Sequence, residues 1–246
     1  MLILPTDKIP AKSVNPSYLI LYGKPKSGKT SIAAALENNL IIDLEGGSNF
    51  LDAMAVQARS INDLASIQQA IVAKNQECKG FFYKRITIDN VTRLEEMCMS
   101  YAISLYKATP QGKNYAGTDI RTLPNGGGYM WIRMAVTKTI NMFRYLCEQF
   151  ILIGHLKEKF IQKDGEEMSE MALSLVGALA DIVCGEADAV GYVYRRKNQT
   201  IISFEGGDDS IREARQPHLT GKKIVIAESD ENNKLSVHWD RVYLPE

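Results

Sequence analysis

Residues 23–30 have the types and spacing of a loop that binds phosphate groups. They fit the pattern G-x-x-x-x-G-K-[ST], in which backbone N–H groups wrap the phosphates and a lysine and a hydroxyl complete the site. Lys29 would place its charge on the β- and γ-phosphates of a nucleoside triphosphate, and Thr30 would place its hydroxyl on Mg²⁺. The predicted nucleotide contacts are Gly23, Lys24, Pro25, Lys26, Ser27, Gly28, Lys29, Thr30 and Ser31.

Three further polar residues follow apolar runs and are suited to act on such phosphates. Asp89 is predicted to hold Mg²⁺ through water, the alternative being the N-cap of a helix. The next residue is Asn90 and not glutamate, so we expect the catalytic base to be Glu45, which is otherwise a solvated loop acid. His155 is predicted to sense the γ-phosphate, the alternative being a histidine satisfied by its neighbours.

Short apolar runs alternate with helical patterns in the first two thirds of the chain, as they do when helices cover a parallel sheet. We expect strands at 18–22, 40–44, 85–88 and 150–153, and helices at 31–36, 63–76, from Thr92 onward, and at 129–148. Thr92 and Glu95 have the spacing of a capping box. Ligands bind at the carboxyl ends of strands in such sheets, which is where the polar residues above lie.

The last third of the chain predicts antiparallel strands. A hairpin starts at 157–163 and turns at Asp164-Gly165, and further strands are expected at 189–194, at 200–204 and twice within 222–244. The predicted fold class is therefore α/β, with a mostly parallel central sheet flanked by helices and antiparallel strands added at the C-terminal side. Residues 1–16 read as an N-terminal arm and residues 17–246 as one domain.

Composition narrows the classes of partner. The 246 residues include 29 basic and 29 acidic ones, so nucleic-acid contact would depend on local patches. Four scattered cysteines predict free thiols in a reducing compartment. No apolar run approaches the roughly 18 residues that span a bilayer, so we expect a cytoplasmic protein without a membrane partner.

The motifs together resemble the RecA-like ATPases. The resemblance lies in the phosphate loop, in Ile42-Asp43-Leu44-Glu45, in Ile86-Thr87-Ile88-Asp89 and in a strand that ends at His155. More narrowly, the chain is similar over roughly residues 17 to 220 to compact bacteriophage RecA-like ATPases, some of which anneal single strands in recombination. The stretches that carry this narrower similarity are Gly154-His155-Leu156-Lys157, residues 175–181 and residues 187–190.

The resemblance implies ATP and Mg²⁺ as ligands, self-association into a ring or filament, and a basic residue supplied to each site by a neighbour. Arg215 is the candidate, with Arg212 as the alternative, although the spacing Arg212-Glu213-Ala214-Arg215 departs from the family's Lys-x-Arg pair. The alternative for Arg215 is a solvated surface arginine. The resemblance also places DNA-binding loops at 109–128 and at the lysines Lys157, Lys159 and Lys163, which could otherwise form a solvated face.

The sequence thus predicts a Mg²⁺-dependent RecA-like ATPase that binds single-stranded DNA in phage recombination, annealing or replication, in the host cytoplasm if the gene is phage-encoded. Its catalytic residues would be Lys29, Glu45 and Arg215. Two other functions remain open at this point. One is a small-molecule or nucleoside kinase with residues 109–128 as its lid, and the other is a nucleotide-gated binding module with little hydrolysis.

Overall fold

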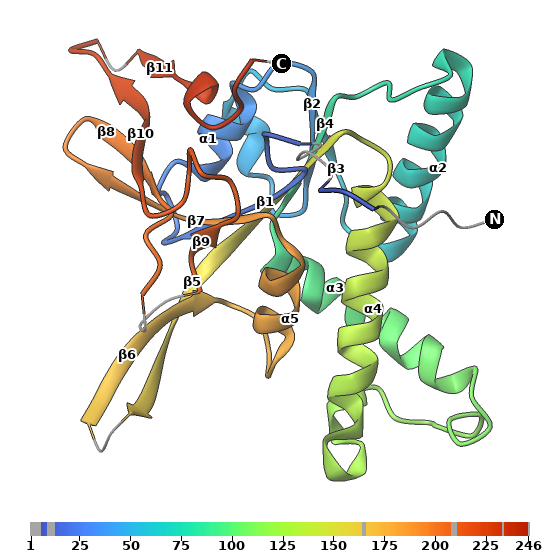
Figure 1. Ribbon diagram of the computed structural model, residues 1–246. Coiled ribbons are helices and arrows are strands. Elements are labelled where there is room, and N and C mark those ends of the chain that lie inside the picture. Colours follow the sequence, from blue (N-terminus) through green and yellow to red (C-terminus); the bar gives the residue numbers. More distant parts are fainter. Residues whose placement is uncertain (1–5, 9–12, 164–165, 208–210, 233, 246) are drawn as a thin grey trace.

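The computed structural model describes residues 6–8, 13–163, 166–207, 211–232 and 234–245, with the side chains of 159–170 outside that description. A twisted sheet forms its centre, in the strand order β11-β10-β8-β7-β1-β5-β4-β2-β3 (Figure 1). Six neighbouring strands are parallel. They are β7 (Ala189–Arg196), β1 (Tyr18–Gly23), β5 (Gln149–Lys163), β4 (Arg85–Asp89), β2 (Asn39–Asp43) and β3 (Ala55–Gln57).

Antiparallel strands extend this sheet from its β7 side. They are β8 (Gln199–Ser203), β10 (Lys223–Ser229) and β11 (Leu235–Val237), while β9 (Glu213–Ala214) pairs with the start of β7. Strand β6 (Glu166–Leu173) pairs with the far half of β5 and forms a long hairpin that projects from the body (Figure 1). The predicted α/β class, mostly parallel with antiparallel strands on the C-terminal side, is confirmed.

Both faces of the sheet are buried, and β1 shows why its sequence is continuously apolar. Tyr18, Ile20 and Tyr22 point to one face and pack with the helices α2 to α5. Leu19 and Leu21 point to the other face and pack with α1 and the C-terminal segment. The helices are α1 (Lys29–Ala34), α2 (Ile61–Cys78), α3 (Val91–Lys107), α4 (Gly127–Arg144) and α5 (Leu179–Glu186).

Several local expectations need correction. The N-cap of α3 is Asn90, whose side chain accepts the N–H of Arg93 at 3.0 Å, so the capping box at Thr92 was wrong. The Thr92 hydroxyl instead donates to the carbonyl of Ser174. Strand β5 continues without a break through His155, where the sequence suggested a strand end followed by a separate hairpin. The short strand β3 was not foreseen, and the expected turn at residues 164–165 lies outside the described residues.

The segment just before β1 is bound to the C-terminal segment. Asn15 exchanges two hydrogen bonds with the backbone of Leu244, at 2.8 and 2.7 Å. The indole of Trp239 donates to the carbonyl of Ile32 at 2.7 Å and so holds the C-terminal segment against α1. The division into an N-terminal arm of residues 1–16 and a single domain stays a prediction. Among the described residues, no helix is both long and apolar enough to cross a membrane.

Candidate nucleotide-binding site

The phosphate loop leaves β1 at the carboxyl edge of the sheet and leads directly into α1. Gly28 has φ of 96°, in the left-handed region that glycine reaches without steric cost. Gly23 is needed for a different reason, because a Cβ there would lie 2.2 Å from the carbonyl oxygen of Val193 on the neighbouring strand. The loop can therefore curl tightly between β7 and the start of α1.

Lys29 is buried and folded back into its own loop. Its Nζ donates to the carbonyls of Gly23 and Lys24 at 3.0 and 2.9 Å and to the hydroxyl of Ser27 at 3.3 Å. Burial lowers the pKa of Lys29, and the carboxylates of Asp89 and Glu45 act against that shift. The ammonium group thus sits in a largely desolvated position where a phosphate would be a stronger partner than the loop carbonyls.

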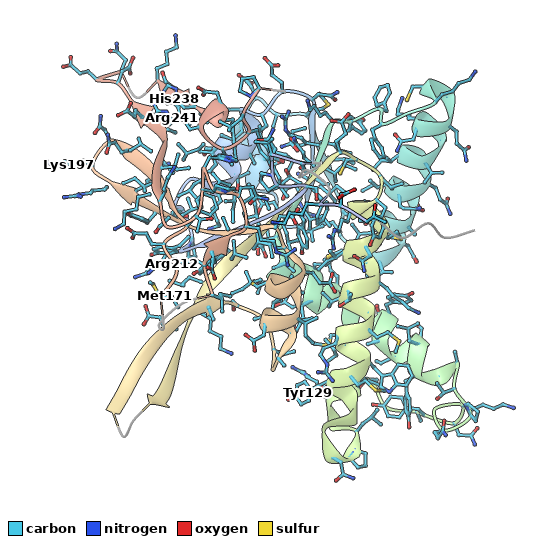
Figure 2. All side chains as sticks on the ribbon, viewed as in Figure 1. Tyr129, Met171, Lys197, Arg212, His238 and Arg241 are labelled. Carbon is cyan, nitrogen blue, oxygen red and sulfur yellow. The ribbon has the colours of Figure 1, made fainter. Side chains whose placement is uncertain are left out.

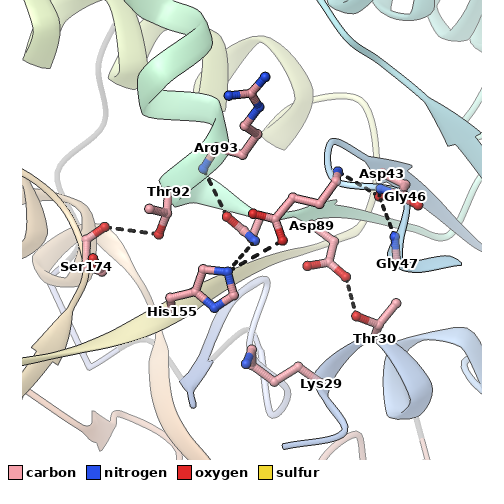
Figure 3. Close-up of polar contacts among 12 residues, drawn as sticks. Lys29, Thr30, Asp43, Gly46, Gly47, Asp89, Thr92, Arg93, His155 and Ser174 are labelled. Carbon is pink, nitrogen blue, oxygen red and sulfur yellow. Dashed lines mark hydrogen bonds and ion pairs between the residues drawn. The ribbon is translucent and has the colours of Figure 1, made fainter. Parts of the chain in front are cut away.

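Thr30 and Asp89, the two residues predicted to hold Mg²⁺, lie within hydrogen-bond distance of each other. The Thr30 hydroxyl donates to Asp89 Oδ2 at 2.5 Å, although the two residues come from α1 and the end of β4 (Figure 3). Burial raises the pKa of Asp89, the hydrogen bond from Thr30 acts against it, and the nearby Asp43 carboxylate adds to it. Because Asn90 caps α3, the Asp89 carboxylate is left facing the phosphate loop.

Asp43 organises the turn that carries Glu45. Its Oδ1 accepts the N–H groups of Glu45, Gly46 and Gly47, and its Oδ2 accepts the N–H of Ser48 at 2.9 Å together with the Ser48 hydroxyl. Burial pushes the pKa of Asp43 upward, but these hydrogen bonds outweigh it and the pKa is lowered. The buried carboxylate therefore fixes the backbone that holds Glu45 at the rim of the site.

His155 lies between Glu45 and Asn90 on the middle of β5. Asn90 Nδ2 is 3.0 Å from His155 Nε2, and Glu45 Oε2 is 3.5 Å from the same nitrogen. Since Asn90 Oδ1 already accepts the N–H of Arg93, its amide nitrogen must donate to His155, which assigns the proton of a neutral ring to Nδ1.

The second ring nitrogen of His155 is a buried donor that has no hydrogen-bond acceptor in this structure. Figure 3 shows it on the side of the ring that faces Lys29. A buried N–H without an acceptor costs free energy, and a phosphate oxygen would satisfy it. The geometry is thus compatible with the sensor role predicted for His155 and with the alternative, in which the Asn90 amide holds the ring.

One pocket of about 480 Å³ is lined by residues 25–31 of the predicted loop, whereas Gly23 and Lys24 lie outside its lining. The other lining residues described above are Asp43, Glu45, Asp89, Asn90 and His155. Two of its lining residues were missed by sequence reasoning. Phe50 at the end of the turn after Glu45 is 92% exposed on the rim, and Arg195 at the end of β7 lies against Gly28. An exposed phenylalanine outside any helical or strand period was the signal for Phe50. No sequence pattern pointed to Arg195, because it reaches the pocket only if β7 pairs with β1.

The residues present fit Mg²⁺ and a nucleoside triphosphate. No cluster of three or more His, Cys, Asp or Glu suited to a metal is found in the described part of the chain. Mg²⁺ is commonly held by one or two protein oxygens together with phosphates and water, and Thr30 and Asp89 offer that number. The pairing of their oxygens, the buried Lys29 and the unsatisfied donor of His155 all face the same pocket.

The remaining predicted residues lie outside this pocket. Arg215 is exposed beside Asp188, at the amino end of β7 and hence at the edge of the sheet opposite the phosphate loop. Arg212 lies beside Tyr192, with its guanidinium 5.9 Å from the ring centroid. Within the 109–128 loop, Arg121 is paired with Asp119 at 2.7 Å. All four cysteines are free, as predicted.

The fold and the loop define the class of protein, which is a P-loop nucleotide-binding protein. A protein-family model described as an AAA domain matches residues 15–233. The chain therefore belongs to the AAA-domain family. A comparison with curated proteins found no match.

Solved structures that match the chain include the following two. The RadB recombinase is 11% identical, with a TM-score of 0.46 over 89% of this chain and 90% of that one. A KaiC-like protein of the hyperthermophilic archaeon Pyrococcus horikoshii OT3 is 14% identical, with a TM-score of 0.45 over 90% of this chain and 89% of that one.

Proposed function

We propose that this chain is a Mg²⁺-dependent, RecA-like ATPase that assembles with copies of itself and acts on single-stranded DNA. The observation that carries the ATPase part is the meeting of Thr30 and Asp89 at 2.5 Å in the pocket that also holds Lys29, Glu45 and His155. Those residues come from α1 and from the ends or middles of β2, β4 and β5, and the family match covers all of them.

Each residue would act on one part of the hydrolysis. Lys29 would leave its loop carbonyls for the β- and γ-phosphates, and His155 would donate from Nδ1 to a γ-phosphate oxygen. Mg²⁺, held by Thr30 and through water by Asp89, would supply charge that neutralises the phosphates. Glu45 would orient a water molecule and take its proton as the water oxygen bonds to the γ-phosphorus and the bond to the β-phosphate oxygen breaks.

Arg215 supports the self-association part of the proposal. It is exposed and lies at the amino end of β7, so it is directed away from the phosphate loop of its own chain. If it serves a nucleotide, that nucleotide must be bound to a neighbouring copy. Such an arrangement would stabilise charge on the transferred phosphoryl group, as a basic residue supplied in trans does in other ATPases.

Phosphate release from ATP with Mg²⁺, with and without oligo(dT), tests the proposal. We expect turnover that increases with DNA and is lost in Lys29→Ala. Glu45→Gln should keep nucleotide binding and lose most turnover, whereas the matched control Glu37→Gln, on an exposed residue outside the pocket, should behave as the wild type. Nucleotide binding without phosphate release by the wild type would refute the ATPase, and turnover indifferent to DNA would refute the DNA part.

A further inference from the structure

A second groove opens beside the phosphate loop, on the other face of the sheet. It has a volume of about 620 Å³, and we call it the tyrosine groove after Tyr192 and Tyr194 of β7. Tyr192 packs with the core cluster of α2 to α5, whereas its neighbour Val193 packs with α1. Residues two apart on a strand point to the same face, so Tyr194 shares the face of Tyr192 and is directed away from α1.

The rings of Tyr192 and Tyr194 line the groove and continue a row that begins at the buried Tyr22. The rings of Tyr22 and Tyr192 have centroids 5.6 Å apart, and those of Tyr192 and Tyr194 are stacked at 5.5 Å with an interplanar angle of 21°. Tyr194 stands at the end of the row and is partly exposed. A flat ring at the end of a stack is a surface on which another planar group can continue the stack.

The walls of the tyrosine groove are basic. Among the described residues, the basic ones that line the groove are Lys24, Lys26, Arg195, Arg212 and Lys223, and the acidic one is Glu205, which is paired with Lys223 at 2.6 Å.

Burial raises the pKa of Tyr192, and Arg212 acts against that shift. A further acid, Glu158 of β5, is near enough to add to the rise. Arg212 donates to the carbonyl of Glu205, which holds its guanidinium beside Tyr192 (5.9 Å to the ring centroid). Figure 2 shows Arg212 and Met171 together where the β5–β6 hairpin leaves the body. Among the described residues that line the groove, basic side chains thus outnumber acidic ones, in a chain whose basic and acidic residues are equal in number.

A nucleotide in the phosphate pocket would leave most of this groove empty. The phosphate pocket has its own exposed ring, Phe50, on the far side of the loop. The two cavities share only the tip of the phosphate loop, residues 25–27, and Arg195. A second set of rings and cations is thus left for a second ligand, which would touch the loop that holds the nucleotide.

The two surfaces predicted from sequence to bind DNA are less suitable. Residues 157–170 of the hairpin contain three lysines against five acids, and in the strand register Lys159 is opposite Glu170 and Lys163 is opposite Glu166. In the 109–128 loop, the Tyr115 hydroxyl donates to the carbonyl of Asp119, and Arg121 is bound to the Asp119 carboxylate. The hairpin sequence is therefore acidic overall, and Tyr115 and Arg121 of the loop are already bound within the chain.

We propose that the tyrosine groove binds single-stranded nucleic acid, with a base stacked on Tyr194 and the backbone phosphates on Arg212 and the groove lysines. A basic groove with stacking rings is the usual means of holding a single strand without sequence preference. The inference rests on the proposed function and gives its DNA a location. Contact with the tip of the phosphate loop would also let nucleotide and strand influence each other's binding.

The test measures the affinity of the full chain for fluorescent oligo(dT), by anisotropy, alongside its affinity for a fluorescent ATP analogue. We expect Tyr194→Ala to weaken oligo(dT) binding by about 5- to 150-fold, the range found when a stacking ring is removed. Tyr194→Phe should retain binding, and so should the matched control Tyr145→Ala, which removes a ring that is 70% exposed at the end of α4. The affinity for the ATP analogue should be unchanged in all three variants.

Salt dependence gives a second measurement in case Tyr194→Ala folds poorly. Arg212→Gln should reduce the slope of log affinity against log salt by about 0.7, the value for one phosphate contact on a single strand. Arg241→Gln is the matched control, because Arg241 also donates to a backbone carbonyl, that of Val225, but lies near the C-terminal segment (Figure 2).

The possible outcomes separate the groove from the function on which it rests. Oligo(dT) binding by the wild type that is unaffected in Tyr194→Ala and Arg212→Gln would refute the groove and leave the DNA function standing. No binding by the wild type, with or without ATP, would refute both the groove and the DNA function, while phosphate release still reports on the ATPase. Equal loss of ATP analogue and oligo(dT) in Tyr194→Ala would show that the ring serves the nucleotide, which also refutes the groove.

Discussion

Asp43→Asn is the substitution that most directly tests how the site is held together. Asparagine can keep one carbonyl oxygen for the N–H groups of Glu45, Gly46 and Gly47, but its NH₂ group must then face the N–H of Ser48, 2.9 Å from Oδ2. A buried N–H left without an acceptor costs about 1–3 kcal/mol. We therefore expect the free energy of unfolding in urea at pH 7 to fall by about that amount.

The same substitution should also change the pH dependence and the activity. Because the pKa of Asp43 is lowered in the folded state, its charge stabilises the protein above pH of about 4, and this contribution is lost as the pH falls through the lowered pKa. The difference in unfolding free energy between wild type and Asp43→Asn should therefore shrink in acid. Turnover should fall by about 100-fold, since a displacement of about 1 Å in a catalytic group has that effect.

Urea unfolding at pH 7 and pH 3, together with phosphate release at pH 7, checks these expectations. Asp52→Asn, on an exposed residue of the same connection, is the matched control and should leave both measurements unchanged. A difference that is the same at both pH values, or an Asp43→Asn enzyme with wild-type turnover, would show that the carboxylate does not organise the turn that carries Glu45.

Three further results are expected from the nucleotide pocket. Mg²⁺ and ATP at about 100 times the dissociation constant should raise the melting temperature by about 5–11 °C, as measured by differential scanning fluorimetry. An equal rise in Lys29→Ala would contradict the placement of the nucleotide on the phosphate loop. Phe50→Ala should weaken ATP binding by about 2- to 12-fold in titration calorimetry, because the base loses a stacking partner. The protein's stability should not fall, since the Phe50 ring is 92% exposed. Unchanged affinity would show that the ring does not touch the base. Asp89→Asn should raise the melting temperature of the nucleotide-free protein, because burial disfavours the charged carboxylate. The same substitution should remove Mg²⁺-dependent turnover. A lowered melting temperature would argue that the charge of Asp89 stabilises the nucleotide-free fold.

The part of the site that could be predicted from sequence is the part set by local chain geometry. The phosphate loop is contiguous, and Asp89 and Glu45 each follow a short apolar run, so the ordering of strands in a parallel sheet was enough to bring them together. The cap of α3 was missed because the choice between Asn90 and Thr92 depends on where β4 ends, which its pairing with β5 decides.

Features that depend on which strands become neighbours could not be predicted in this way. Tyr192 and Tyr194 have the spacing of one strand face, but nothing local indicates that this face lies beside the phosphate loop. Strand β3 has only three residues, none of them buried, and so lacks the apolar pattern that marked the others. Phe50 is exposed and outside any period, and its meaning comes from the pocket beside it.

The unbroken course of β5 gives the protein a mechanical property. His155 and Lys163 lie on one continuous strand, about 26 Å apart at 3.3 Å per residue, so a tilt of about 10° at His155 would displace the far end by about 5 Å. Pairing with β6 over that length stiffens the strand into a two-stranded beam. A tilt of about 10° at the residue that faces the phosphate pocket would therefore reach the far end of the hairpin as a movement of about 5 Å, without any hinge within the strand.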